Sequence, residues 1–187
     1  MSDGAWHELI AGAERSASAG RAAMQAHHPS VAVLACSDAR VPPSVVFDQP
    51  AGELFVVRLA GNTASPSAVA SLEYAVDHLG VELIVVLGHT HCGAVAAAVD
   101  GACDGSLSAV VAPICSVAER AGCTDPEMLS RLNVASTMRD IATSSPAIGP
   151  ALQDGRVVIR GAVYDMVAGD IIDVDCLDDA VDTPTPH

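Results

Sequence analysis

Two short stretches of the chain combine side chains that bind metals with side chains that carry charge. The first, Cys36–Arg40, reads Cys-Ser-Asp-Ala-Arg, and the second, His89–Cys92, reads His-Thr-His-Cys. Cys36, His89 and Cys92 would supply two thiolates and one imidazole, a ligand set that suits zinc. The spacing of His89 and Cys92 would let both face one ion across a helical turn. Three protein ligands leave a fourth tetrahedral position for water, which is typical of a catalytic zinc, and the ion would lower the pKa of that water to roughly 7.

Asp38 and Arg40 add a charged pair beside the first expected ligand. In extended backbone the side chains of Cys36, Asp38 and Arg40 project to the same side, and the arginine would keep the carboxylate ionised. Asp38 could accept a hydrogen bond from zinc-bound hydroxide, or it could bind the zinc directly and exclude the water; the residues leave both states open. His91 stands between His89 and Cys92. The spacing that lets those two face one ion points the His91 side chain away from it, so we expect His91 to have a structural role or to support a ligand by a hydrogen bond.

Both stretches follow apolar runs that predict buried strands, at Val31–Ala35 and Val81–Leu87. Further strands are predicted at 53–58, 156–164 and 169–174, and helices at 5–26, 67–78, 94–99 and over most of 106–145. Continuously apolar strands that alternate with helices predict an α/β fold, with a mainly parallel central sheet flanked by helices. Sites in such sheets form beyond the carboxyl ends of the strands, where both metal-binding stretches lie. We expect one catalytic domain at 29–175, preceded by a helical segment at 1–28 and followed by a tail at 176–187.

The composition excludes several classes of partner. The chain has 187 residues and a formal net charge of -14, and arginine supplies all nine basic side chains. This balance disfavours nucleic acids and anionic membrane surfaces as partners, and no apolar run approaches the ~20 residues of a membrane span. The N-terminus lacks the pattern of a secretory signal, so a cytoplasmic location is expected. Disulfides are not expected there, and four cysteines are interpreted as small buried side chains: Cys103, Cys115, Cys123 and Cys176.

These residues, taken together, resemble the beta-class carbonic anhydrase family over about residues 29–175. The matching stretches are 35–41, 52–58, 60–62, 71–76 and 85–93, with a weaker match at 161–164 and Gly169. The resemblance implies a zinc enzyme that interconverts carbon dioxide and bicarbonate, with Cys36, His89 and Cys92 as ligands and Asp38 with Arg40 as the catalytic dyad. It also implies a homodimer or larger homo-oligomer with the active site at the subunit interface.

The resemblance further implies that Phe55, Tyr74 and Gly93 line a narrow apolar substrate pocket. The alternatives are core packing for the two aromatic residues and a role in backbone geometry for Gly93. The chain departs from the pattern where many members have a glutamine nine positions before the first ligand, because His27 stands there. His27 would replace that donor, shuttle protons or lie solvated in a loop. Val33 stands where one subgroup has the tryptophan of an inhibitory bicarbonate pocket, so that pocket is not expected.

Our leading hypothesis from the sequence is the reversible hydration of carbon dioxide to bicarbonate and a proton through zinc-bound hydroxide. Two alternatives remain open. Carbonyl sulfide and carbon disulfide hydrolases resemble the same family and share its metal ligands. A non-catalytic zinc protein, in which Asp38 closes the coordination sphere, would carry the same motifs.

Overall fold

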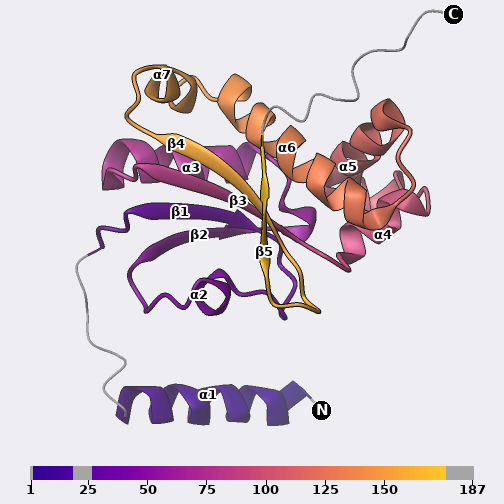
Figure 1. Ribbon diagram of the computed structural model, residues 1–187. Coiled ribbons are helices and arrows are strands. Elements are labelled where there is room, and N and C mark those ends of the chain that lie inside the picture. The colour runs from indigo at the N-terminus through magenta and orange to yellow at the C-terminus, as the bar shows by residue number, and fades with distance from the viewer. Residues whose placement is uncertain (1, 19–26, 176–187) are drawn as a thin grey trace, which may run out of the picture.

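The computed structural model describes residues 2–18 and 27–175. Its elements, in chain order, are α1 (Ser2–Ser18), β1 (Val31–Ala35), α2 (Pro43–Val46), β2 (Leu54–Arg58), the 3-10 helix η1 (Ala60–Asn62), α3 (Pro66–Leu79), β3 (Leu83–His89), α4 (Gly93–Val99), the 3-10 helix η2 (Gly105–Leu107), α5 (Ser108–Ala121), α6 (Pro126–Ser144), α7 (Ile148–Gln153), β4 (Val158–Tyr164) and β5 (Ile171–Val174). The predicted α/β fold is confirmed (Figure 1). Within the described residues, no helix combines the length and the apolar character that crossing a membrane requires.

The five strands form one sheet in the order β2-β1-β3-β4-β5. Strands β1, β2, β3 and β4 all run parallel to one another, and β5 runs antiparallel to β4, so the sheet is mixed and mainly parallel. Strand β1 lies between β2 and β3, with Ala35 in register with Arg58 on one side and Leu87 on the other. The carboxyl ends of these three strands therefore meet at one edge of the sheet.

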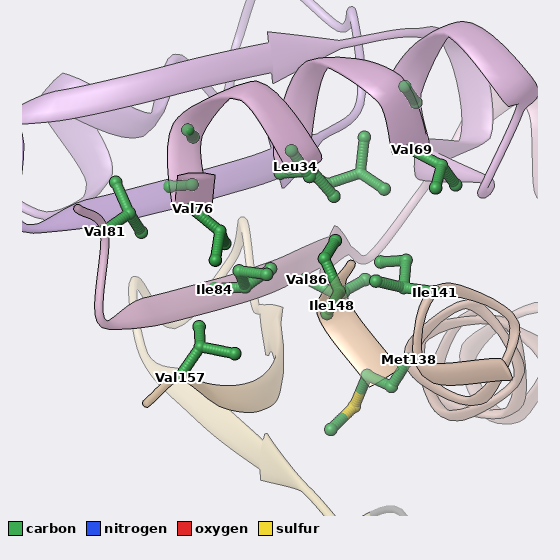
Figure 2. Packing of buried hydrophobic residues seen from close by; sticks show 14 of the residues in the cluster. Leu34, Val69, Val76, Val81, Ile84, Val86, Met138, Ile141, Ile148 and Val157 are labelled. Atoms are coloured by element: carbon green, nitrogen blue, oxygen red, sulfur yellow. The ribbon is translucent and has the colours of Figure 1, made fainter. Parts of the chain in front are cut away.

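Both faces of the central strands are covered, which explains why their sequences are continuously apolar. Successive side chains of a strand point to opposite faces: Ala32 and Leu34 of β1 pack with α3, α6 and α7, whereas Val33 and Ala35 pack on the other face with Val46 of α2. Figure 2 shows the first of these layers, where Leu34, Ile84 and Val86 of the sheet meet residues of the covering helices. This packing holds β1 and β3 in place relative to the covering helices.

Helix α3 covers the predicted helix at 67–78 and extends one residue beyond it at each end. The Ser65 side chain accepts a hydrogen bond from the Ala68 N–H, and Pro66 occupies the first turn. Gly80 ends the helix in the left-handed conformation, with φ 71. These are the usual capping roles of serine, proline and glycine.

Two secondary-structure predictions need correction, and a third is tested only in part. Strand β3 continues to His89, two residues beyond its predicted end, because Gly88 and His89 pair with Val163 and Tyr164 of β4. Helix α7 was not predicted; its N-terminus is held by the Ser145 hydroxyl, which accepts hydrogen bonds from two main-chain N–H groups. The described part of the N-terminal helix is Ser2–Ser18, and the rest of its predicted range, 19–26, lies outside the described residues. The domain boundaries stay a prediction.

The prediction that the chain has no disulfide is wrong. Cys103 and Cys115 are joined, with their Cα atoms 6.0 Å apart, a separation usual for disulfides. Cys103 follows α4 and Cys115 belongs to α5, and packing of these two helices brings the thiols together. Composition cannot show such a pairing. Cys123 is free and partly exposed, and Cys176 lies outside the described residues.

Candidate metal centre

The ends of β1 and β3 bring together the three predicted metal ligands. Cys36 directly follows β1, His89 is the last residue of β3, and Cys92 immediately precedes α4. One ligand atom from each of the three lies within 4.8 Å of the others, and among the described residues no other group of three or more such side chains converges in this way. All three are buried, with exposed fractions of 5%, 1% and 4%. The predicted convergence is confirmed.

The hydrogen bonds of His89 leave one of its ring nitrogens available. Nδ1 lies 2.8 Å from the main-chain oxygen of Thr90; since a carbonyl oxygen only accepts, Nδ1 carries the hydrogen. Nε2 is then unprotonated in the neutral ring, and it is buried without a hydrogen-bond partner. An unprotonated nitrogen whose ring is oriented through the other nitrogen is the usual form of a metal-binding histidine.

The separation of the two sulfur atoms fits a zinc ion. Sγ of Cys36 and Sγ of Cys92 are 3.9 Å apart. Two sulfurs bound tetrahedrally at roughly 2.3 Å from one ion would be about 3.8 Å apart. The ligand set, its burial and this distance therefore all suit zinc.

The surroundings of the two sulfurs affect them in opposite ways. A hydrogen bond from the Cys92 thiol lowers the pKa of Cys36, and the N–H of Gly61, 3.4 Å from Cys36 Sγ, adds to this effect. Cys92 donates that hydrogen bond and is buried, so its own pKa is raised. Cys36 is thus the sulfur that most readily becomes a thiolate, the form that binds metals.

Asp38 and Arg40 form a close ion pair beside the ligand group. Oδ1 of Asp38 accepts from the main-chain N–H and from Nε of Arg40, at 3.0 and 2.9 Å, and Oδ2 accepts from Nη2 at 2.6 Å. These contacts hold the pKa of Asp38 well below its usual range. Asp38 does not belong to the group of converging ligands. Both oxygens of its carboxylate are engaged by the Arg40 side chain.

Arg58 at the end of β2 and Gly61 in η1 both donate hydrogen bonds to the Cys36–Arg40 stretch. The guanidinium of Arg58 donates through Nε to the carbonyl of Cys36, at 2.8 Å, and through Nη2 to the carbonyl of Asp38, at 2.5 Å. We did not single out Arg58 from the sequence. The signal that could have found it is its place at the end of β2, level with the end of β1.

Phe55 and Tyr74 lie together, but no contact places them beside the three ligands. Their ring centroids are 6.2 Å apart, and Tyr74 is 49% exposed. His27 is exposed, with its ring centroid 6.2 Å from that of Phe55. Phe55 also packs against the core under α3, so packing accounts for much of its environment.

The two other residues singled out near Cys92 are both exposed. Gly93 is the first residue of α4, with no atom within 4 Å of the position that a Cβ would occupy. His91 adopts a positive φ of 56, and its carbonyl accepts a hydrogen bond from Arg40 Nη2 at 3.3 Å. As expected, the His91 side chain is not part of the ligand group.

Comparison with known proteins identifies the family. The family model described as "Carbonic anhydrase" matches residues 31–171. The chain belongs to the beta-class carbonic anhydrases. It is 36% identical to "Carbonic anhydrase 2" of Mycobacterium tuberculosis (strain CDC 1551 / Oshkosh) over 149 residues, which cover 75% of this chain and 72% of the relative. It is 39% identical to "Carbonic anhydrase" of Pseudomonas aeruginosa over 168 residues, 81% of this chain and 74% of the relative.

A solved structure of the family agrees with the fold. One of two tetrameric beta-carbonic anhydrases from the filamentous ascomycete Sordaria macrospora aligns with a TM-score of 0.73 and 29% identity, over 94% of each chain. Cys36, His89 and Cys92 form the triad that is typical of the zinc site of beta-class carbonic anhydrases.

Proposed function

We propose that this carbonic anhydrase hydrates carbon dioxide reversibly to bicarbonate and a proton, with zinc held by Cys36, His89 and Cys92. The observation that carries the proposal is the unpartnered Nε2 of His89, on a ring that converges with two buried sulfurs. Leaving a buried polar atom without a partner costs about 1–3 kcal/mol. Binding a metal ion at Nε2 gives that atom a partner.

Zinc at this site would supply Lewis acidity that lowers the pKa of a coordinated water to roughly 7. Asp38 orients the attacking oxygen. A carboxylate offers about four acceptor positions, and Arg40 fills three of them, two on Oδ1 and one on Oδ2. The acceptor position left on Oδ2 takes the hydrogen of the attacking oxygen, which directs a lone pair of that oxygen toward the carbon.

Arg40 keeps Asp38 in the state that this task requires. Its guanidinium fixes the plane of the carboxylate through two side-chain hydrogen bonds and holds the pKa of Asp38 low. Asp38 therefore stays an acceptor across the working pH range and does not donate a proton. Because Arg40 also donates to the carbonyl of His91, the dyad is linked to the loop that carries Cys92.

Phe55, Tyr74 and Gly93 are proposed to line the substrate pocket. Apolar walls suit carbon dioxide, which has no net dipole. Phe55 and Tyr74 pack with each other, and neither belongs to the buried cluster that holds Cys36 and Cys92. We therefore propose that they act on the site of a second copy. Trp6 and Leu9 on α1 are 61% and 68% exposed, and such exposed apolar side chains support a homodimer or a larger homo-oligomer.

The contacts of Asp38 disfavour one of the two alternatives. A non-catalytic zinc protein would need Asp38 as the fourth ligand, and the engagement of both its oxygens by Arg40 favours the open site instead. No observation favours carbonyl sulfide or carbon disulfide over carbon dioxide. The cytoplasmic location stays a prediction, and the Cys103–Cys115 bridge is its main difficulty, because disulfides are rare in reducing compartments.

The test is stopped-flow hydration of carbon dioxide by protein whose zinc content is measured, with carbonyl sulfide and carbon disulfide assayed in parallel. We expect about one zinc per chain, faster hydration of carbon dioxide than of the sulfur analogues, and loss of activity on chelation. Cys36→Ser should lose zinc and activity together, whereas Cys123→Ser, which removes a free cysteine outside the ligand group, should retain both. Zinc-loaded wild-type protein without hydration activity at any pH would reject the proposal.

A further inference from the structure

A covalent bridge outside the ligand group ties together two of the segments that surround the metal centre. Cys103 lies between α4 and α5, and Cys115 lies in the middle of α5. Cys115 belongs to the same buried apolar cluster as Cys36 and Cys92. Figure 1 shows α4 and α5 side by side at one end of the sheet. The bridge therefore restrains helices that pack around the metal ligands.

A short chain of contacts leads from the bridge to Cys36. Ile114, next to Cys115, is fully buried, and its Cδ1 lies 2.6 Å from the position that a Cβ on Gly61 would occupy. Ile114 thus packs directly on the main chain at Gly61. The N–H of Gly61 donates to Cys36 Sγ, and the Gly61 carbonyl accepts from Nδ2 of Asn133 at 2.9 Å. A shift of α5 would move the donor that supports the Cys36 sulfur.

The two sulfurs of the bridge differ in their access to solvent. Cys103 is partly exposed, and its neighbours in the segment 101–107 are exposed on both sides. Cys115 is 4% exposed. Cys103 is therefore the half of the bridge that is more open to an external thiolate. The buried metal ligands, Cys36 and Cys92, are protected in the same way as Cys115.

We infer that the Cys103–Cys115 disulfide is a redox-sensitive brace of the metal centre, which a dithiol opens from the side of Cys103. This inference rests on the proposed function, because it assumes that the centre holds zinc. One thiolate of the dithiol attacks the Cys103 sulfur, the S–S bond breaks, and Cys115 leaves as a thiolate that takes up a proton. The second thiol of the dithiol then displaces Cys103, so the dithiol is oxidised to its disulfide and the protein gains two thiols.

Opening the bridge frees the segment 101–107 and the first turns of α5 from their covalent restraint. Ile114 then holds Gly61 less firmly, and the Cys36 sulfur loses part of the support of the Gly61 N–H. Contacts that orient the ligands of a metal typically change its affinity by about 10- to 100-fold when they are removed. We expect an effect at the lower end of this range, because the direct Arg58 contacts to the Cys36 stretch remain.

The test compares zinc-loaded, full-length wild-type protein with the double variant C103S/C115S and with C123S as the matched control. Alkylation under non-reducing conditions followed by mass spectrometry should find Cys103 and Cys115 joined in wild type. Transfer of zinc to a chromogenic chelator should be about 10-fold faster from C103S/C115S than from wild type, and unchanged in C123S. Equal transfer rates for wild type and the double variant, or free thiols at both positions in wild type, would overturn the inference.

A second measurement covers the case in which the double variant folds poorly and separates the bridge from direct chelation by the reductant. Wild-type and C103S/C115S proteins are treated briefly with dithiothreitol, which is then removed by gel filtration, and zinc transfer is measured again. Treatment should accelerate transfer from wild type only, and reoxidation should restore the original rate. An equal acceleration in both proteins would overturn the inference. Zinc retention that depends on the bridge in a protein without hydration activity would instead reject the proposed function and leave the brace in place.

Discussion

The guanidinium of Arg58 donates to the carbonyl of Cys36 at 2.8 Å and, through a second nitrogen, to the carbonyl of Asp38. One side chain of β2 therefore fixes the main chain on both sides of Ser37, between a metal ligand and the residue that orients the nucleophile. Lysine at this position would supply a single ammonium group in place of the planar fork. Arg58 acts through these two residues and is thus a positioning residue.

We predict that Arg58→Lys lowers kcat by about 10-fold and accelerates zinc loss, because a side chain that no longer holds both carbonyls lets the ligand stretch move. Stopped-flow hydration and zinc transfer to a chelator give the two readouts. Arg156→Lys is the control. Arg156 is exposed, and its Nε lies 3.8 Å from Oδ2 of Asp154 in a surface ion pair that does not involve the site. An Arg58→Lys variant that equals wild type in both readouts would show that these contacts do not support the site.

Asp38→Asn should lower kcat by about 100-fold or more while zinc content stays near one per chain. The asparagine amide keeps the shape of the side chain but has no charge and presents a donor where Oδ2 accepts. Arg40→Lys should cost less, because Asp38 stays intact and loses only its paired hydrogen bonds. Zinc content must be measured on the same samples. Loss of zinc from Asp38→Asn would show that Asp38 supports metal binding and would contradict the orienting role.

The main features of the site could be predicted from the sequence because they follow from local patterns. Val31–Ala35 and Val81–Leu87 are apolar runs whose ends carry the ligands, and parallel strands that end at one edge bring those ligands together. Asp38 and Arg40 are close enough in the chain for their pairing to be local.

What could not be predicted depends on packing between distant segments. The support of Cys36 by Arg58 requires the register of β2 beside β1. The Cys103–Cys115 bridge requires α4 and α5 to pack together. The antiparallel direction of β5, by contrast, follows from the short connection 165–170 after β4, because neighbouring parallel strands need a crossover of a dozen or more residues.

Gly61→Ala tests how tightly Ile114 packs under the metal centre. Gly61 has φ 74, and an added Cβ would lie 2.6 Å from Ile114 Cδ1 and 3.1 Å from the Ala94 Cβ. Positive φ costs an alanine about 1–2 kcal/mol, and overpacking adds about 1–3 kcal/mol. We therefore expect the free energy of unfolding to fall by about 2–5 kcal/mol, as measured by urea denaturation, with faster zinc loss.

Gly80→Ala is the matched control for this variant. Gly80 has nearly the same backbone conformation, φ 71, but nothing lies within 4 Å of the position of its Cβ. It should therefore show only the conformational cost of about 1–2 kcal/mol and no change in zinc loss. If the two variants lose equal stability and release zinc equally, the methyl group added at position 61 is not crowded by Ile114.

Asp165 gives the protein a specific dependence of stability on pH. It begins the turn between β4 and β5, where its Oδ1 accepts from the N–H groups of Val167 and Ala168 at 2.8 and 3.1 Å. These hydrogen bonds lower the pKa of Asp165 below its ordinary value, and the one from Ala168 has the larger effect. The contribution to stability is therefore fully present above the unfolded-state pKa of about 3.9 and is lost as pH falls through the folded-state pKa.

Asp165→Asn should separate this charge effect from the turn itself, because the amide oxygen still accepts hydrogen bonds but does not titrate. Wild type should be more stable than the variant near neutral pH, and the difference should shrink as pH falls below about 4 through the lowered pKa of the folded-state carboxylate. Urea midpoints measured at several pH values give the comparison. Asp154→Asn, at an exposed position of a surface ion pair, should follow wild type more closely. A constant difference between wild type and Asp165→Asn across this range would mean that the ionised carboxylate contributes nothing beyond the hydrogen bonds that an amide can also accept.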